Sequence, residues 1–350
     1  MKLKLFFLLL FPTISWSQNY GELAEKMYQK VHENFYDKKT NLYTNLNAEN
    51  RKYSELWGLC SMMQVANEME KKNPNQAFIT NILNIIEQYY SEKKSQGGYD
   101  SYLIKLGGGD RYYDDNQWIG IALMDAYKRT KNQTYLTKSE MIYDFMMMGY
   151  DDVLGGGLYW REVDKLTKNT CSNAPGIILA LQLYQANSNK KYLETATKLY
   201  DWTNRRLRTQ ERLFYDNVIT KNDSIDKRIY SYNTGAMLQA NLYFYEITQE
   251  RKYLIEAQKM AQSAAKAFYE SGKFIDDYWF NAVMLRALVH LYRFDNDKNR
   301  LNLFKTCTDY ALKNDQNKLG LMGKNSLINL VNQAGMVEIL LRLSEVKFTE

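Results

Sequence analysis

The sequence predicts an all-α protein, an (α/α)6 toroid in which six helical hairpins form an inner and an outer ring. Three observations lead to this prediction: prolines are rare, apolar residues recur at helical spacing, and the chain contains an internal repeat. Only 3 of the 350 residues are proline, at Pro12, Pro74 and Pro175, so long helices are seldom interrupted. The chain has 45% hydrophobic and 25% charged residues and a mean hydropathy of -0.53, values typical of a globular protein with a sizeable core.

The first 17 residues have the three zones of a secretory signal peptide. Lys2 and Lys4 supply positive charge, residues 5–11 are apolar, and small serines precede Gln18. This apolar run is too short to span a bilayer, and no later stretch reaches about 18 uninterrupted apolar residues. We therefore expect an exported protein, periplasmic or secreted, whose residues 18–350 form one domain that is not held in a membrane.

The charge of the chain gives no indication of a nucleic-acid partner. Loss of Lys2 and Lys4 with the leader lowers the formal net charge from +6 to +4. The remaining lysines and arginines are not clustered as they are in proteins that bind nucleic-acid phosphates. We therefore expect neither a nucleic acid nor a membrane among the partners of the mature protein.

The internal repeat consists of a tyrosine followed nine residues later by a leucine. Four such pairs occur, at spacings of 57, 61 and 47 residues: Tyr127/Leu136, Tyr184/Leu193, Tyr245/Leu254 and Tyr292/Leu301. Each unit contains an apolar helix with hydrophobic residues three or four positions apart, then a short polar turn and a second helix. The repeat therefore predicts consecutive αα-hairpins.

Twelve helices are predicted in chain order. They cover residues 20–34, 54–70, 76–91, 115–130, 133–148, 173–187, 190–206, 231–248, 250–268, 278–295, 297–313 and 326–343. Twelve helices make six hairpins, which close into a toroid with one helix of each pair inside and one outside. An open solenoid built from the same hairpins is the alternative.

The repeat also predicts where a functional site lies, because equivalent positions in a toroid converge on one rim. The residues thirteen positions before the repeat tyrosines stand at the expected starts of the first helices: Asp114, Cys171, Tyr232 and Trp279. Their neighbours are polar or aromatic: Asp115, Ser172, Asn173, Asn233, Asp277 and Tyr278. Some of these side chains would cap helix starts, but carboxylates, amides and aromatic rings on one rim also suit a carbohydrate cleft. The glycine runs at 107–109 and 155–157 are expected to be rim loops.

The adjacent carboxylates Asp114 and Asp115 are the candidate catalytic residues. Two carboxylates can supply a nucleophile or base and a general acid for glycoside hydrolysis, and their adjacency favours the retaining arrangement. Mutual repulsion would raise the pKa of one carboxyl, whereas the helix dipole would lower both pKa values. The structural alternative makes Asp114 an N-cap, with Gln117 three residues later in a loose capping box.

Further candidates for a sugar contact are aromatic or carry an amide. Trp118 and Trp160 could stack on sugar rings, although a tryptophan at helical spacing also suits a core. Asn173, Tyr232 and Asn233 could hydrogen-bond to hydroxyls, and helix capping just before Pro175 is the competing role of Asn173.

No metal or cofactor is expected. The only histidines are His32 and His290, and no cysteine pair has the spacing of a zinc site. Neither glycine run belongs to a dinucleotide fingerprint or a P-loop. Cys60, Cys171 and Cys307 could form at most one disulfide, and we expect mostly buried free thiols.

Five motifs support a family resemblance. In order, they are Tyr113-Asp114-Asp115-Asn116-Gln117-Trp118, Gly155-Gly156-Gly157-Leu158-Tyr159-Trp160, Lys168-Asn169-Thr170-Cys171-Ser172-Asn173, Tyr215-Asp216 and Tyr230-Ser231-Tyr232-Asn233-Thr234-Gly235. This pattern, which covers most of the mature chain, resembles glycoside hydrolase family 76, a family of α-1,6-mannanases. The resemblance implies an (α/α)6 fold and endo-acting, retaining catalysis, with Asp114 as nucleophile, Asp115 as general acid/base and Asp216 as a sugar-binding residue. Thr170 and Thr234 depart from the family, which often has a small residue such as Ala and a Gln there.

The sequence as a whole predicts a secreted or periplasmic hydrolase of α-1,6-mannosidic linkages that acts as a monomer. Its partners would be α-mannan polysaccharide or manno-oligosaccharides. One alternative is a transglycosylase or another (α/α)6 polysaccharide-active enzyme, such as a hydrolase or lyase of acidic glycans. The other alternative is a non-catalytic glycan-binding protein.

Overall fold

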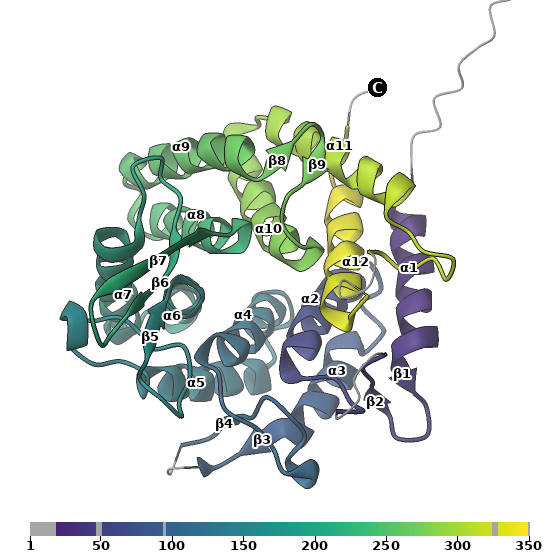
Figure 1. Cartoon of the computed structure of the whole chain (residues 1–350), viewed down its shortest axis with the longest axis horizontal. Coiled ribbons are helices and arrows are strands. Elements are labelled where there is room, and N and C mark those ends of the chain that lie inside the picture. The colour runs from purple at the N-terminus through teal and green to yellow at the C-terminus, as the bar shows by residue number, and fades with distance from the viewer. Residues whose placement is uncertain (1–18, 47–50, 94–95, 324–327, 349–350) are drawn as a thin grey trace, which may run out of the picture.

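A computed structural model describes residues 19–46, 51–93, 96–323 and 328–348, which contain twelve α-helices in two concentric rings (Figure 1). The predicted all-α class and (α/α)6 toroid are thereby confirmed. The predicted signal peptide, residues 1–17, lies outside the described residues.

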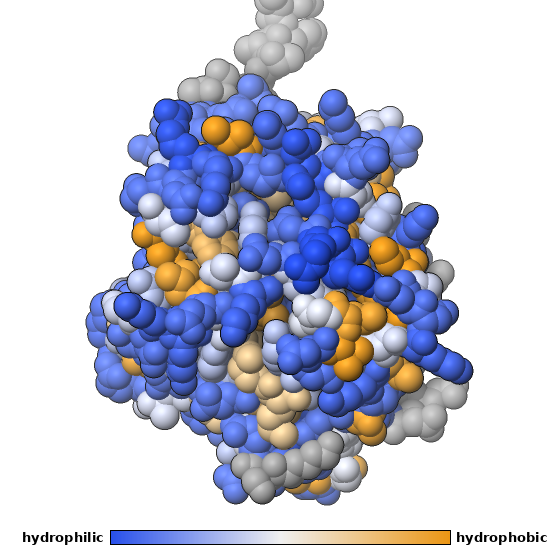
Figure 2. Space-filling model, turned by 90° about the vertical axis from the view of Figure 1, so that its left-hand side faces the viewer, coloured by the Kyte–Doolittle hydropathy of each residue, from blue (hydrophilic) through white to orange (hydrophobic). Residues whose placement is uncertain are grey.

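Six helices line the axis of the toroid and six cover them. The inner helices are α2 (Leu56–Lys72), α4 (Tyr113–Thr130), α6 (Thr170–Asn187), α8 (Ser231–Thr248), α10 (Tyr278–Asp295) and α12 (Leu330–Ser344). The outer helices are α1 (Tyr20–Phe35), α3 (Phe78–Ile86), α5 (Gln133–Met147), α7 (Lys190–Leu207), α9 (Arg251–Ala267) and α11 (Asn299–Asn314). An inner helix such as α6 is buried along most of its length, whereas the outer helix α7 buries one stripe. The face in Figure 2 is accordingly mostly hydrophilic, with scattered hydrophobic spots.

The repeat tyrosines have one structural role in four inner helices. Helices α4, α6, α8 and α10 each have 18 residues and end at a C-cap in the left-handed conformation. In each case the C-cap N–H donates to the carbonyl of the repeat tyrosine: Tyr127, Tyr184, Tyr245 or Tyr292. This cap satisfies a carbonyl that the helix end would leave unpaired. The repeat therefore fixes where each helix ends and, by its length, where each begins.

The toroid closes through both ends of the described chain. Helix α12 packs between α10 and α2, and α1 covers α12 from outside. Gly335 allows this close approach, because a Cβ there would lie 2.6 Å from the Cα of Trp279 on α10. The sixth inner and outer pair thus consists of the last and the first helix.

Short strands lie at the end of the toroid where the inner helices begin, in the connections from outer to inner helices. The strands are β1 (Tyr36–Asp37), β2 (Leu42–Tyr43), β3 (Tyr90–Ser91), β4 (Gly98–Tyr99), β5 (Thr167–Asn169), β6 (Tyr215–Ile219), β7 (Ser224–Ile229), β8 (Tyr269–Glu270) and β9 (Lys273–Phe274). β5, β6 and β7 form an antiparallel sheet beside α6 and α7, and the others form two-stranded hairpins. The predicted helix 76–91 is too long: α3 stops at Ile86, after which a 3-10 turn leads into β3.

The cysteine prediction agrees with the structure, since Cys60, Cys171 and Cys307 are buried and unpaired. Among the described residues, no helix has both the length and the apolar character needed to cross a bilayer.

Candidate active site

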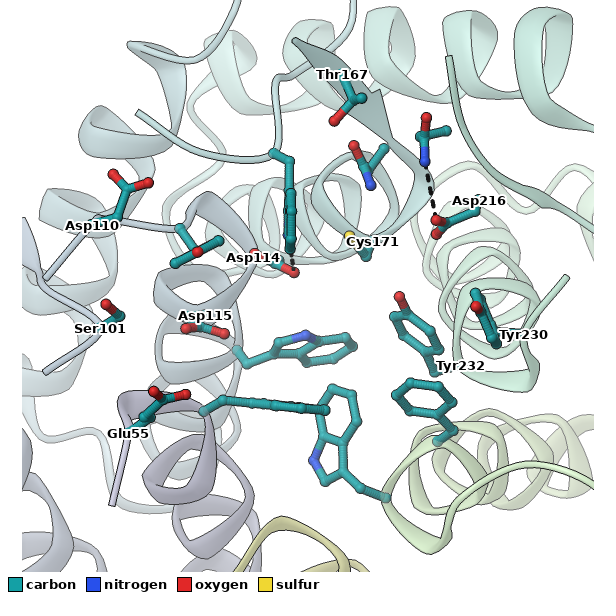
Figure 3. Close-up of a pocket in the computed structure, with 18 of the residues that line it drawn as sticks. Glu55, Ser101, Asp110, Asp114, Asp115, Thr167, Cys171, Asp216, Tyr230 and Tyr232 are labelled. Atoms are coloured by element: carbon teal, nitrogen blue, oxygen red, sulfur yellow. Dashed lines mark hydrogen bonds between the residues drawn. The ribbon is translucent and has the colours of Figure 1, made fainter. Parts of the chain in front are cut away.

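A cavity of about 580 Å³ lies where the inner helices begin (Figure 3). It is lined by carboxylates, aromatic rings and amides: Arg51, Glu55, Trp57, Ser101, Asp110, Tyr112, Asp114, Asp115, Trp118, Trp160, Thr167, Asn169, Cys171, Asp216, Asn217, Arg228, Tyr230, Tyr232, Trp279 and Phe280. Five inner helices and the β5–β6–β7 sheet contribute to this lining.

The four rim residues that the repeat predicts all reach this cavity. Asp114, Cys171, Tyr232 and Trp279 each occupy the second position of an inner helix, and each lines the cavity. These four inner helices have equal lengths, and each ends at its own repeat tyrosine. Their second residues therefore lie at equivalent depths along the axis. The site is therefore a consequence of the repeat.

Asp114 combines burial with several hydrogen-bond donors. The indole Nε1 of Trp160 donates to Asp114 Oδ2 at 3.3 Å (Figure 3). Burial raises the pKa of Asp114 to about 6, and this effect outweighs the Cys171 thiol, the backbone N–H groups at the helix start and the Trp160 indole, which all lower it. The Asp114 carboxyl group therefore loses its proton near pH 6 and is a carboxylate base at neutral pH.

Asp115 has a more strongly perturbed environment. Burial raises its pKa well above the ordinary range, and the negative charges of Asp114 and Glu55 raise it further. Behind it, the Cys60 thiol donates to the Asp115 carbonyl oxygen at 3.2 Å, which ties this first turn of α4 to α2. The two aspartates titrate as one coupled pair, in which Asp115 is the group that keeps its proton.

Aromatic rings form the floor and one wall of the cavity. Trp279 contacts Trp118 and Trp57 edge to face, with ring centroids 5.5 Å apart in both pairs. Tyr232 stacks on Phe280 at 4.2 Å. Trp118 is only 2% exposed, whereas Trp57 and Trp160 are 36% and 37% exposed. Trp118 therefore supports the floor, and Trp57 and Trp160 present open faces on which a sugar ring could stack.

Asp216 lies on the wall opposite Asp115 (Figure 3). The amide of Asn217 donates to its Oδ2 at 3.0 Å, and Arg228 lies 3.6 Å from the same oxygen. Burial raises the pKa of Asp216, while Asn217, Arg228 and the fully buried Asn233 lower it. Asn233 thus lies behind Asp216 and does not line the cavity.

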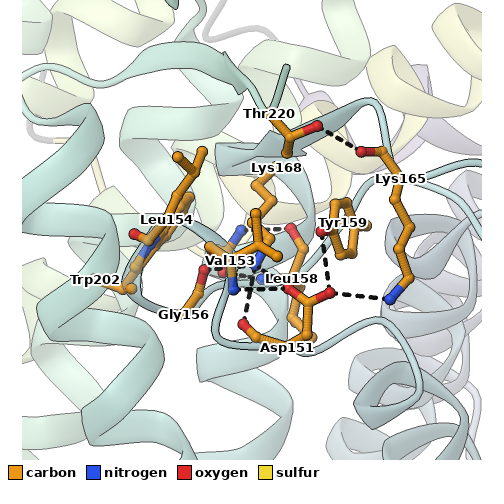
Figure 4. A network of polar contacts seen from close by, with 12 residues as sticks. Asp151, Val153, Leu154, Gly156, Leu158, Tyr159, Lys165, Lys168, Trp202 and Thr220 are labelled. Atoms are coloured by element: carbon orange, nitrogen blue, oxygen red, sulfur yellow. Dashed lines mark hydrogen bonds and ion pairs between the residues drawn. The ribbon is translucent and has the colours of Figure 1, made fainter. Parts of the chain in front are cut away.

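The loop that carries Trp160 is held together by the buried Lys168, whose contacts are shown in Figure 4. The fully buried ammonium of Lys168 donates to the carboxylate of Asp151 at 2.8 Å and to the carbonyls of Asp151, Val153 and Gly156. Gly157 has a φ of +85°, and a Cβ there would lie 2.6 Å from the Trp202 ring. The glycine run at 155–157 therefore packs under the rim, and the loop that it starts delivers Trp160 to the cavity.

Two expectations about helix starts are wrong. The N-cap of α4 is Tyr112, whose side chain makes no capping bond, so Asp114 is inside the first turn and does not cap the helix. Asn173 is fully buried, its Oδ1 accepts from the Leu158 N–H at 2.8 Å, and its Nδ2 donates to the Leu158 and Asn169 carbonyls. Asn173 therefore clamps a loop to α6 and is not brought into the cavity, just as Asn116 clamps Tyr99 to α4.

Sequence reasoning missed Trp57 and Glu55, which line the cavity at the start of α2. The tyrosine repeat does not reveal them, because the residue thirteen positions after Trp57 is Glu70, whereas the other units have tyrosine there. Asn169, Asn217 and Arg228 were also missed, since the sheet that carries them has no clear two-residue hydrophobic period.

The chemistry available in the cavity is that of acids, bases and aromatic surfaces. Within the described residues, no group of three or more histidine, cysteine or acidic side chains is arranged to hold a metal ion. A carboxylate that ionises near pH 6, beside a carboxylic acid with a higher pKa, can pair nucleophilic attack with proton donation. An (α/α)6 toroid with a carboxylate pair and aromatic rings at one rim is an arrangement suited to glycoside hydrolysis.

The chain belongs to glycosyl hydrolase family 76, whose sequence profile matches residues 19–278. A mannan endo-1,6-alpha-mannosidase, DCW1 of Candida albicans, is 29% identical over 195 residues, which are 48% of this chain and 43% of that protein. DCW1 of Saccharomyces cerevisiae is 26% identical over 194 residues. The chain thus spans about 43% of the length of these curated relatives.

Solved structures match nearly the whole chain. A family 76 mannosidase from Bacteroides thetaiotaomicron has a TM-score of 0.82 and 25% identity, and the match covers 93% of this chain and 98% of that one. An α-1,6-mannanase of a Salegentibacter species, an inactive variant with two adjacent aspartates changed to asparagine and bound to α-1,6-mannotriose, has a TM-score of 0.77. It is 22% identical, with 93% of this chain and 99% of that one covered, and this likeness supports the fold alone.

Proposed function

We propose that this protein is an exported hydrolase that cleaves α-1,6-mannosidic linkages inside mannan chains with retention of configuration. The observation that carries the proposal is the unequal pair at the start of α4, in which Asp114 has hydrogen-bond donors and Asp115 faces two negative charges. Export rests on the leader-like residues 1–17, which would leave residues 18–350 as a single domain. The curated relatives, which are mannan endo-1,6-alpha-mannosidases, support the substrate class. The Salegentibacter enzyme, inactive when two adjacent aspartates are changed, offers an analogy for the carboxylate pair.

The reaction would proceed in two displacements. The Asp114 carboxylate attacks the anomeric carbon while the Asp115 carboxyl gives its proton to the departing glycosidic oxygen, which leaves a glycosyl ester on Asp114. Asp115, now ionised, takes a proton from a water molecule that attacks the same carbon, and Asp114 is released as a carboxylate. Trp57 and Trp160 would hold sugar rings by stacking, and Asp216 would accept hydrogen bonds from hydroxyls.

Product analysis with linear α-1,6-mannan tests the proposal. We expect a series of short manno-oligosaccharides, with the newly formed end in the α configuration when NMR spectra are recorded early. Asp114→Asn and Asp115→Asn should each lower kcat/KM by about 10³-fold or more, because each removes a group that acts only in the transition state.

Asp125→Asn is the matched control for these two variants. Asp125 lies on the same helix, accepts from the Gln182 amide at 2.8 Å and does not line the cavity. It should keep near wild-type activity. An unchanged rate in Asp114→Asn or Asp115→Asn would contradict the assignment, and longer oligosaccharides as the main products would indicate a transglycosylase.

A further inference from the structure

A second cavity, also of about 580 Å³, lies on the outer wall of the toroid between α1 and α3. Its lining shares no residue with the catalytic cavity: Tyr28, His32, Tyr36, Asn41, Tyr43, Phe78, Asn81, Ile82, Asn84, Ile85 and Gln88. We call this cavity the α1–α3 groove. Both helices lie in the right-hand half of Figure 1, near β1 and β2, whose Tyr36 and Tyr43 also line the groove.

One side of the groove is a row of stacked rings. Tyr28 and His32 on α1 and Tyr36 directly after it are four residues apart, which places them on one helix face. The His32 ring centroid lies 4.7 Å from that of Tyr28 and 5.1 Å from that of Tyr36, with the latter pair nearly parallel. The Tyr43 hydroxyl, 3.2 Å from His32 Nδ1, fixes the central ring. The row is therefore a rigid stack of rings, in which the central His32 ring is packed between Tyr28 and Tyr36.

The other side is a row of carboxamides. Asn81 and Asn84 on α3, followed by Gln88, are spaced by three and four residues and so share a face. Asn81 and Asn84 are exposed, and their carboxamides make no hydrogen bond with any residue that the structure describes. Each therefore has one donor and one acceptor group available for a ligand.

The groove contains no charged side chain at neutral pH. None of its lining residues is Asp, Glu, Lys or Arg, although these types make up 25% of the chain. Burial and the nearby Lys38 lower the pKa of His32, which keeps its ring neutral. Burial raises the pKa of Tyr28 to about 12. The lining itself offers an ionic ligand no charged group, and the nearest cations are at its border: Lys38 near His32, and Lys105, which donates to Gln88 Oε1 at 3.3 Å. A neutral ligand rich in hydroxyl groups would find aromatic contacts and paired donors and acceptors in the lining.

We propose that the α1–α3 groove binds a neutral polysaccharide, the same α-mannan chain that the catalytic cavity cleaves, and so holds the polymer on the enzyme between cleavage events. The aromatic row would contact the apolar faces of sugars through its ring edges and its outer rings, and the carboxamides would bind the sugar hydroxyls. The identity of the polysaccharide rests on the proposed function, but the preference for a neutral glycan rests on the groove itself.

The test uses the double variant Asn81→Ala/Asn84→Ala. Both positions are exposed on a helix, where alanine is favourable, so the variant should fold normally. The matched control is Asn302→Ala, an exposed asparagine on the outer helix α11. All three proteins carry Asp114→Asn so that the polysaccharide is not consumed, and their retardation is compared in native gels containing α-1,6-mannan or another neutral polysaccharide.

We expect the double variant to bind α-mannan about fivefold more weakly, the effect of losing one or two hydrogen bonds, and Asn302→Ala to bind normally. With Asp114 restored, the double variant should cleave mannotetraose at the wild-type rate and the polymer with a raised KM. Equal retardation of all three proteins in every gel would overturn the proposal. If the wild type releases nothing from mannan but its retardation by another neutral polysaccharide depends on Asn81 and Asn84, the groove stands and the proposed function fails.

Discussion

Two sets of carboxylates lie among the inner helices, one partly buried at the cavity and one fully buried below it, and they differ in the charges around them. At the start of α4, burial raises the pKa values of Asp114 and Asp115, and the negative charges of Asp114 and Glu55 raise that of Asp115 further. About two helical turns further along the axis, Glu338 of α12 receives two hydrogen bonds from Arg286, at 2.6 and 2.8 Å, and one from Arg342 at 2.8 Å. Despite its complete burial, Glu338 has a pKa lowered to about 2, because the two arginines outweigh desolvation.

The comparison indicates that burial alone does not decide what a carboxylate does. Glu338 joins α12 to α10, and Arg342 continues the network to Glu68 of α2 at 2.9 Å, across the point where the ring closes. Its charge is compensated, so its role is to hold the ring together. The charges of Asp114 and Asp115 are not compensated by a cation, so a proton is exchanged readily there. Arg286 connects the two regions. Besides its pair with Glu338, its guanidinium lies 5.3 Å from the ring centre of Trp118, which lines the cavity.

Glu338→Gln should produce the largest change in stability. It leaves Arg286 and Arg342 buried without their shared counter-charge, which costs about 3–5 kcal/mol in comparable buried pairs. Chemical denaturation at pH 7 would measure this loss. Because the folded pKa of about 2 lies below the ordinary 4.5, the contribution of Glu338 is present above pH 4.5 and is lost as the pH falls towards 2. The difference between variant and wild type should therefore shrink in acid.

Glu250→Gln is the control for this prediction, because Glu250 pairs with Lys252 on the surface, where both side chains are more than half exposed. A Glu338 variant as stable as the Glu250 variant at pH 7 would contradict the structural role of the network.

Asp114→Asn should change stability in the opposite direction. The folded pKa of Asp114, about 6, lies above its ordinary value of 3.8, so this group favours the folded state below pH 3.8 and that contribution is lost as the pH rises through 6. A neutral amide does not have to ionise in the cavity, so the variant should gain about 3 kcal/mol at pH 8 relative to wild type, with little difference at pH 4. Denaturation curves at both pH values would measure the gain. A loss of stability at pH 8 would show that the ionised Asp114 is compensated after all.

The sequence predicts the carboxylate pair at the cavity better than it predicts the ion-pair network around Glu338. The repeat tyrosines locate the starts of α4, α6, α8 and α10, and hence Asp114 and its equivalents, because a cap at a fixed place in helices of fixed length leaves little freedom. No local pattern pairs Glu338 with Arg286, which are 52 residues apart and meet only when the ring closes. The same limit explains Trp57, on a helix without the repeat tyrosine, and Asn173, whose partner Leu158 comes from a loop. Helix periodicity is local, whereas loop clamps and ring closure depend on tertiary contacts.

The smallest expected effect is a shift in the pH dependence of catalysis. In the proposed mechanism Asp114 acts in its ionised form, so kcat/KM should fall as the pH drops below about 6, the pKa of Asp114. Trp160→Phe removes the indole donor that stabilises this ionised form, so the pKa of Asp114 should rise and the acid limb should move up by about half a pH unit. Trp57→Phe is the matched control: Trp57 is equally exposed in the cavity but has its ring against Trp279 and Phe280. It should raise KM by weakening sugar stacking and leave the acid limb in place. If both variants shifted the acid side of the pH profile equally, the indole hydrogen bond would not explain why the pKa of Asp114 is lower than that of Asp115.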